Sequence, residues 1–81
     1  MIEGLRIGQV AQRVGLRMRA IRYYEQIRLI PRAERNSIAP SGYRLFRESD
    51  VRRLEFIRDA RKLGLSLKQI RNLLSLSLIH I

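Results

Sequence analysis

The feature that most constrains the fold is the stretch from residue 11 to residue 26, which has the spacing of two helices joined by a tight turn. Ala11 is small enough to let two helices approach closely, and Gly15 can take the positive φ angle that a tight turn needs. Ile21 then provides an apolar anchor for the second helix. This combination is typical of a helix-turn-helix.

One face of the second helix is polar and basic. After the turn, four side chains recur at i, i+3, i+4 and i+7, which places them on one side of a helix: Arg19, Arg22, Tyr23 and Gln26. Guanidinium, phenol and amide groups suit phosphate oxygens and the edges of bases. A solvated basic face would have the same composition, but the position directly after the turn favours contact with DNA.

The distribution of charge points to the same region. The chain has 17 Lys and Arg against 7 Asp and Glu, a formal net charge of +10, and only two of the 17 are lysine. Arginine binds phosphate and guanine through a planar pair of donors, although a GC-rich genome also enriches arginine. Residues 1–47 hold ten basic and three acidic side chains, whereas residues 48–81 hold seven and four. The excess therefore lies with the helix-turn-helix and the segment after it.

Composition excludes several classes of protein. A chain of 81 residues makes one domain at most. It has no cysteine, and its single histidine is His80, so we expect no metal site and no cofactor. No G-x-S-x-G motif or phosphate-binding glycine loop occurs, and we expect no enzyme activity. The apolar run over 73–81 is too short and too interrupted to span a bilayer, so a cytoplasmic location is expected.

Apolar spacing predicts four helices. The first carries Ile7, Val10, Ala11 and Val14, and Gly15 ends it. The second covers 18–26, with three side chains facing inward: Met18, Ile21 and Tyr24. The third covers 47–63, with a buried stripe of Val51, Leu54, Ile57 and Leu63 beside a mixed-charge solvated face. The fourth begins at the capping box of Ser66 and Gln69, and its apolar positions are Leu67, Ile70, Leu73 and Leu74.

A small hairpin is predicted between the second and third helices. Pro31 bars further helix, residues 32–42 have the composition of a loop, and 43–46 are rich in strand-forming residues. We expect 29–31 to pair with 43–46 as a wing beside the helix-turn-helix. The expected fold class is therefore mostly α, a winged helix-turn-helix with a β-hairpin wing and then a helix pair. It covers residues 1–75, and 76–81 form an apolar tail of unassigned structure.

Five motifs follow one another along the chain: I-G-Q-V-A-Q-R-V-G-L, I-R-Y-Y-E, L-I-P-R-A-E-R, S-G-Y-R-L-F and L-G-L-S-L-K-Q-I. Together they resemble the MerR family of bacterial transcription regulators, over about residues 6–74. The resemblance implies a sequence-specific DNA-binding domain of winged-helix type. Its second helix, 18–26, would enter the major groove, and its wing, 29–46, would grip the flanking backbone.

The resemblance implies specific DNA contacts. Carried over by position, they are Arg19, Arg22, Tyr23 and Tyr24 on the second helix and Tyr43 and Arg44 on the wing. Gln26 is added because it shares the helical face of these residues. Arg17 and Arg35 are added as electrostatic contacts, although Arg35 could equally be solvated. Tyr24 falls near the inward side, where a buried ring can still present its hydroxyl to a phosphate. Glu25 is expected to position Arg22 or Arg28 through an ion pair.

The resemblance also implies partners. Members of the family usually act as homodimers on an inverted repeat inside a promoter with an overlong spacer, and they distort that DNA so that polymerase can use it. The expected partners are therefore double-stranded promoter DNA, RNA polymerase indirectly, and a second copy of the chain that binds through the C-terminal region.

The chain departs from the family pattern in three places. It stops before the long dimerisation helix and the effector domain, Arg28 stands where glycine is usual, and the loop around 36–40 looks longer. We therefore expect the wing to start differently. Two alternatives stay open: an excisionase-like or architectural winged-helix protein without promoter activation, and a protein-interaction module. The latter would use the apolar C-terminal residues Leu73, Leu74, Leu76, Leu78 and Ile79.

Overall fold

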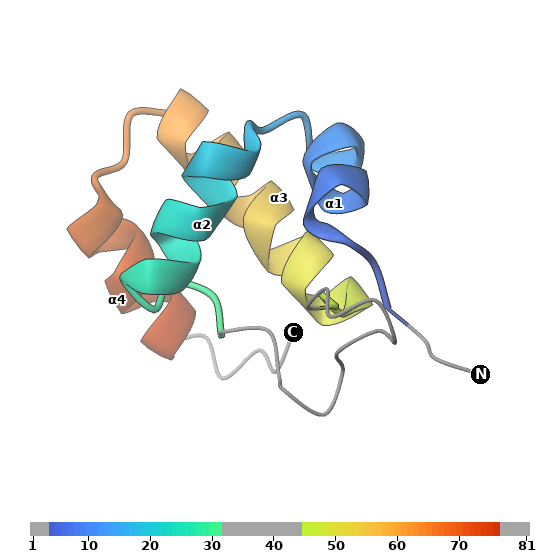
Figure 1. Ribbon diagram of the computed structural model, residues 1–81. Helices are drawn as coiled ribbons and strands as arrows, with labels where there is room; N and C mark the ends of the chain where they lie inside the picture. Colours follow the sequence, from blue (N-terminus) through green and yellow to red (C-terminus); the bar gives the residue numbers. More distant parts are fainter. Residues whose placement is uncertain (1–3, 32–44, 77–81) are drawn as a thin grey trace.

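The computed structural model describes residues 4–31 and 45–76, and these form four helices. They are α1 (Ile7–Val14), α2 (Met18–Gln26), α3 (Glu48–Lys62) and α4 (Leu67–Leu76). Figure 1 shows α3 at the centre, with α2 crossing in front of it and α1 and α4 on either side. The four predicted helices are confirmed, with ends that differ by no more than a residue or two. None of the described helices has the length and hydropathy needed to cross a membrane.

The turn between α1 and α2 follows from one glycine. Gly15 has φ 71° and ψ 31°, the left-handed conformation that glycine adopts without steric strain. Its N–H donates to the carbonyl of Ala11 at 2.9 Å, and the N–H of Leu16 donates to the same oxygen at 3.2 Å. These bonds satisfy a carbonyl that the end of α1 would otherwise leave open. The predicted helix-turn-helix is therefore confirmed.

Side-chain caps set the starts of α3 and α4. The N–H of Arg47 donates to Oδ2 of Asp50 at 2.9 Å. The predicted capping box of α4 is present in both directions, because Ser66 N–H donates to Oε1 of Gln69 at 2.8 Å and Gln69 N–H donates to Oγ of Ser66 at 3.1 Å. Each bond satisfies a donor that has no partner inside its helix.

One apolar core joins all four helices. Val10 and Val14 come from α1, Ile21 from α2, three residues from the middle of α3 and Ile70 from α4, and all are buried. The three from α3 are Val51, Leu54 and Ile57. Leu29, Ile30 and Phe46 complete the core from outside the helices. The position of α2 on the molecule is therefore set by burial shared with every other helix.

Two residues predicted to face inward are exposed. Leu63, the residue directly after α3, is 80% exposed. It follows the exposed Phe56 by two helical turns and so lies on the same outer side. Met18 is 44% exposed. It is the first residue of α2, and helical side chains tilt toward the N-terminus, so its side chain extends past the end of the helix rather than into the core.

The predicted hairpin is not seen among the described residues. Phe46 pairs with Leu5 in an antiparallel bridge, with N–H to O distances of 2.9 and 2.7 Å. Leu29 and Ile30 lie in a buried turn instead of a strand, where both N–H groups donate to the carbonyl of Tyr24. Residues 32–44, most of the expected wing, lie outside the described part of the chain, as do 77–81 of the expected tail. Leu76, assigned to that tail, belongs to α4.

Candidate nucleic-acid interface

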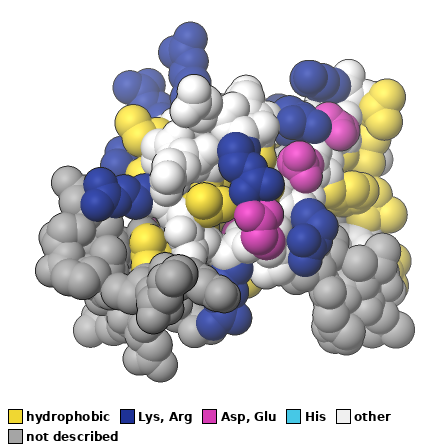
Figure 2. Space-filling model, turned by 90° about the vertical axis from the view of Figure 1, so that its right-hand side faces the viewer, with side chains coloured by type: hydrophobic (Ala, Val, Ile, Leu, Met, Phe, Trp, Pro, Cys, Tyr) yellow, Lys and Arg dark blue, Asp and Glu magenta, His cyan; other side chains and the backbone are white. Residues whose placement is uncertain are grey.

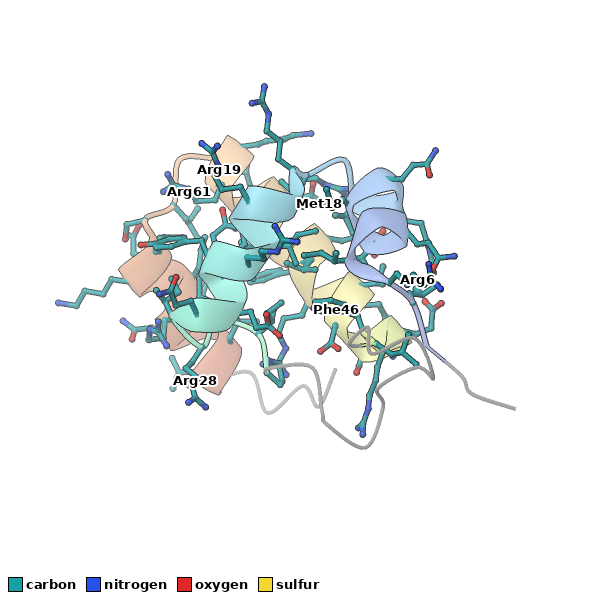
Figure 3. All side chains as sticks on the ribbon, in the orientation of Figure 1. Arg6, Met18, Arg19, Arg28, Phe46 and Arg61 are labelled. Carbon is teal, nitrogen blue, oxygen red and sulfur yellow. The ribbon has the colours of Figure 1, made fainter. Side chains whose placement is uncertain are left out.

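The polar face predicted for α2 is exposed. Its four members lie at the surface on one side of the helix: Arg19, Arg22, Tyr23 and Gln26. On the opposite side Ile21 is fully buried and Glu25 is buried. Figure 3 shows Arg19 projecting from the first turn of α2. Arg17, which precedes the helix in extended conformation, is also exposed. A helix that is anchored on one side and basic on the other is suited to lie against an anionic polymer.

Two tyrosines on α2 pack against each other. The ring centroids of Tyr23 and Tyr24 are 6.0 Å apart and their planes are tilted by 52°, within the range of favourable aromatic pairs. Tyr24 is half-buried against the core, whereas Tyr23 is exposed. The pair therefore holds the exposed phenol of Tyr23 in a limited set of directions, which suits a contact with a defined partner atom.

Arginines from α3 and α4 hold the ends of both helices in the helix-turn-helix. Nη1 of Arg58 donates to the carbonyl of Val14, the last residue of α1, at 2.9 Å. Nη2 of Arg71 donates to the carbonyl of Ile27, directly after α2, at 2.6 Å. Cations stabilise helix C-termini, where carbonyl groups lack partners. These two arginines therefore position the helix-turn-helix.

The interpretation of α3 as a merely solvated charged face is wrong for Arg58. Its guanidinium also pairs with Asp59 at 2.8 Å, and this hydrogen bond raises the pKa of Arg58 and lowers the pKa of Asp59. Sequence reasoning missed the positioning role because Arg58 and Val14 are 44 positions apart. The signal in the sequence that could have indicated this role was a basic residue at a half-buried position of α3.

An exposed ion pair joins α1 to α3. Arg13 and Glu48 meet through two hydrogen bonds of 2.6 and 3.1 Å. The hydrogen bonds between the two side chains, together with their opposite charges, raise the pKa of Arg13 and lower the pKa of Glu48. Figure 2, which views the α1 side, shows acidic side chains among the basic ones. This mixed face contrasts with α2, whose one acidic residue, Glu25, is buried.

Two carboxyl groups are buried, one on the inner side of α2 and one in the first turn of α3. Asp50, at the start of α3, is 6% exposed, and Glu25 is 9% exposed. Burial raises the pKa of Asp50, and the charge of Glu25 raises it further, while the Arg47 backbone N–H and the charge of Arg53 oppose the shift. The proposed ion pair of Glu25 with Arg22 or Arg28 stays a prediction.

Arg28 has φ 65°, so it occupies the left-handed region that glycine favours. It is the only non-glycine residue in that region among the described residues. The expectation of a different start to the wing stays a prediction. The backbone keeps the glycine-like conformation, and the arginine is held in it.

The structure does not place the remaining predicted contacts. Arg35, Tyr43 and Arg44 lie outside the described residues. The described part of the chain brings together no group of three or more His, Cys, Asp or Glu side chains that could hold a metal ion.

Comparison with known proteins identifies relatives of this arrangement. A family model described as "MerR HTH family regulatory protein" matches residues 5–77. The HTH-type transcriptional regulator ZntR of Escherichia coli K12 is 45% identical over 71 residues, which are 88% of this chain and 48% of ZntR. The mercuric resistance operon regulatory protein of Bacillus cereus is 42% identical over 69 residues, 85% of this chain and 50% of that protein. The chain thus spans about half the length of these curated relatives.

Solved structures share the fold. A MerR family transcriptional regulator from Bacillus cereus superposes with a TM-score of 0.73 at 29% identity, over 89% of this chain and 52% of that one. HiNmlR, described as a MerR family regulator lacking the sensor domain and bound to promoter DNA, superposes with a TM-score of 0.79 at 23% identity. That match covers 98% of this chain and 58% of HiNmlR.

Proposed function

Because this chain belongs to the MerR family of helix-turn-helix regulatory proteins, we propose that it binds double-stranded promoter DNA and regulates transcription. The observation that carries the proposal is the exposed face of α2, on which two guanidinium groups, a phenol and an amide project from one rigid helix. The buried position of Glu25 leaves that face without an exposed acidic side chain. The fold shared with a promoter-bound regulator supports this proposal.

In the proposed complex, α2 lies in the major groove. Arg19, Arg22 and Gln26 contact base edges, since arginine suits guanine and glutamine suits adenine. Arg17 and Tyr23 bind backbone phosphates at the start and side of the helix. Tyr24 contributes its hydroxyl from the edge of the core.

The wing, 29–46, completes the proposed interface. Tyr43 and Arg44 contact the DNA backbone beside the major groove, and Arg35 adds an electrostatic contact. Support comes from the family membership and from the position of Phe46, which the bridge to Leu5 ties to the segment directly before α1. The end of the wing is thereby attached to the helix-turn-helix.

A homodimer is the proposed DNA-binding form, with RNA polymerase as an indirect partner through the distorted promoter. The exposed leucines at the end of α4 support self-association, because Leu73 is 42% and Leu76 is 74% exposed. Deleting 76–81 and measuring the mass in solution tests this surface. An unchanged monomer would exclude it as the interface.

The deciding experiment is selection of bound duplexes from a random-sequence pool at about 150 mM salt, where exposed charges are screened beyond roughly 8 Å. An enriched inverted repeat supports a symmetric, promoter-binding dimer. Enrichment of single half-sites or direct repeats supports the excisionase-like alternative, and no enrichment contradicts sequence-specific binding.

Matched variants connect the selection to α2. Arg22→Gln removes one charge from the exposed face of α2, and Arg52→Gln removes one charge from the exposed side of α3. We expect Arg22→Gln to weaken binding to the selected site about tenfold or more, since a bidentate base contact contributes about 1–3 kcal/mol. Arg52→Gln should change affinity little. Equal losses would indicate a non-specific response to charge.

A further inference from the structure

A small pocket lies where the end of α2, the middle of α3 and the end of α4 meet. Three arginines line it, one from each region: Arg28, Arg53 and Arg71, together with Leu29, Leu74 and Ser75. Its volume is about 180 Å³, it opens to solvent, and none of these lining residues is acidic. Figure 3 shows Arg28 just beyond the end of α2. The pocket therefore concentrates positive charge outside the face proposed to read bases.

Backbone and side-chain contacts hold these arginines near one another. Arg71 is fixed by its hydrogen bond to the carbonyl of Ile27, the residue before Arg28. A guanidinium has five N–H donors, so this bond leaves others for a ligand. Arg53 is half-buried on α3, and Arg28 is held at φ 65°. Strained backbone of this kind tends to persist where a side chain serves a site.

The charges of three arginines that line one opening repel one another, and a bound anion offsets that repulsion. The planar donor pairs of arginine match the oxygens of a phosphate, and such charge-assisted bonds are among the stronger ones in proteins. A water molecule occupies about 30 Å³ of liquid, so the pocket has room for a phosphate that replaces a few waters. Leu29 and Leu74 form its apolar wall and limit the access of water to these bonds.

We propose that this pocket binds a phosphate group, supplied either by the DNA backbone near the end of α2 or by free phosphate. The shared chemistry is that of a phosphate oxyanion held by arginine donors. The DNA source rests on the proposed function above, whereas the free-phosphate source does not.

The test is a titration of the protein with inorganic phosphate, followed by amide and arginine N–H resonances in NMR and compared with chloride at equal ionic strength. We expect saturable shifts at the pocket. Arg28→Gly and Arg53→Gln should each weaken binding about tenfold or more, because each removes a charge-assisted donor group. Arg52→Gln, which removes the same charge from a neighbouring position outside the pocket, should leave binding unchanged.

Folding does not confound the comparison. Glycine suits φ 65°, so Arg28→Gly is expected to fold at least as well as the native chain. An unchanged pattern of amide resonances away from the pocket confirms this for each variant. The absence of saturable shifts, or an equal loss of binding in Arg52→Gln, would overturn the proposal.

A second arm separates the two sources. If DNA supplies the phosphate, DNA-bound protein no longer takes up free phosphate, and Arg53→Gln lowers the salt slope of DNA binding by about 0.9 relative to Arg52→Gln. If free phosphate is the ligand, DNA-bound protein still binds free phosphate, and the two variants have equal salt slopes of DNA binding. If the protein binds phosphate but no DNA, the proposed function is contradicted and the proposal of a phosphate-binding pocket is supported.

Discussion

Arg28 shows how one residue can carry strain at a place where local geometry favours glycine. Its left-handed conformation brings the Cβ atom close to the carbonyl oxygen, a contact that glycine avoids. The turn after α2 still needs this conformation, because Leu29 and Ile30 must enter the core directly after it. The side chain is thereby held at the rim of the arginine-lined pocket.

Arg28→Gly should stabilise the domain by about 0.5–1 kcal/mol, the relief of the strained Cβ less the greater entropy of unfolded glycine. Urea unfolding measures the difference. Arg28→Ala is the control, since it removes the same charge but keeps the Cβ atom. Equal stability of the two variants would show that charge, and not backbone strain, determines the effect.

Asp50 gives stability a distinct pH dependence. Its pKa is raised in the folded protein, mainly by burial, so the folded state binds its proton more tightly than the unfolded state does. The contribution of this group is therefore most favourable below its ordinary pKa of 3.8 and declines as the pH rises through the folded value. The neighbouring Glu25 strengthens this trend.

Asp50→Asn should remove that decline, because the amide oxygen still accepts the bond from the Arg47 N–H without carrying a charge. We expect the stability of the variant relative to the native protein to increase between pH 3.5 and pH 7. Urea titrations at several pH values provide the measurement. A constant difference across that range would rule out Asp50 as the source.

At the scale of elements, the two halves of the chain depend on each other through capping. The N-termini of α3 and α4 are capped from within their own first turns, by Asp50 and by Ser66 with Gln69. The C-terminal ends of α1 and α2 receive arginines from α3 and α4. The helix pair that follows the helix-turn-helix therefore supports it through specific bonds as well as through shared burial.

Ser66→Ala should destabilise the domain by about 1 kcal/mol, the usual effect of losing an N-cap. That loss corresponds to a fall of about 4–8 °C in the melting temperature of a domain of this size. Ser75→Ala, in the same helix, is the control, since the Ser75 hydroxyl bonds only to the carbonyl of Asn72 among the described residues. A matching fall in both variants would show that the cap contributes nothing specific.

At the scale of the molecule, one core and an uneven surface determine what the domain can do. Every helix buries at least one residue in the same cluster, so α2 cannot move without disturbing the others. The α1 side carries mixed charges, whereas the exposed face of α2 carries arginines. The exposed face of α2 is thus a basic region without an exposed acidic residue, in a chain whose net charge is +10.

The shared core predicts a single cooperative transition. Ile70→Val should lower the free energy of unfolding by about 0.5–1.5 kcal/mol. Hydrogen exchange should show that loss of stability in the core of α1 as well as in α4. Leu73→Ala, at a partly exposed position of α4, should cost less. A loss confined to α4 would mean that this helix unfolds separately.

The basic face of α2 predicts a steep salt dependence of DNA binding. If each protomer neutralises about four to six phosphates, log K falls against log salt with a slope of about −3.6 to −5.4 per protomer. Fluorescence anisotropy with a labelled duplex over a range of salt concentrations measures the slope. A flat response would argue against phosphate contacts as the main source of affinity.

Much of the fold could be predicted from the sequence because its signals are local. Gly15, the capping box at Ser66 and the apolar repeats act over four residues or fewer, and they correctly located all four helices. The polar face of α2 also follows from spacing alone. Met18 was misplaced because a repeat does not show where the core stops covering the end of a helix, and Leu63 because it shares a side with the exposed Phe56 and not with the buried stripe.

The sequence by itself determined the helices, the turn between the first two and the basic face of α2. Only the tertiary structure decided that Phe46 pairs with Leu5, that Arg58 and Arg71 bond to Val14 and Ile27, and that three arginines share a pocket. The bridge and the two arginine bonds join residues more than 40 positions apart, and the pocket brings together residues from three separate regions of the chain. No local repeat specifies such distant partners, because they meet only when the common core brings their helices together.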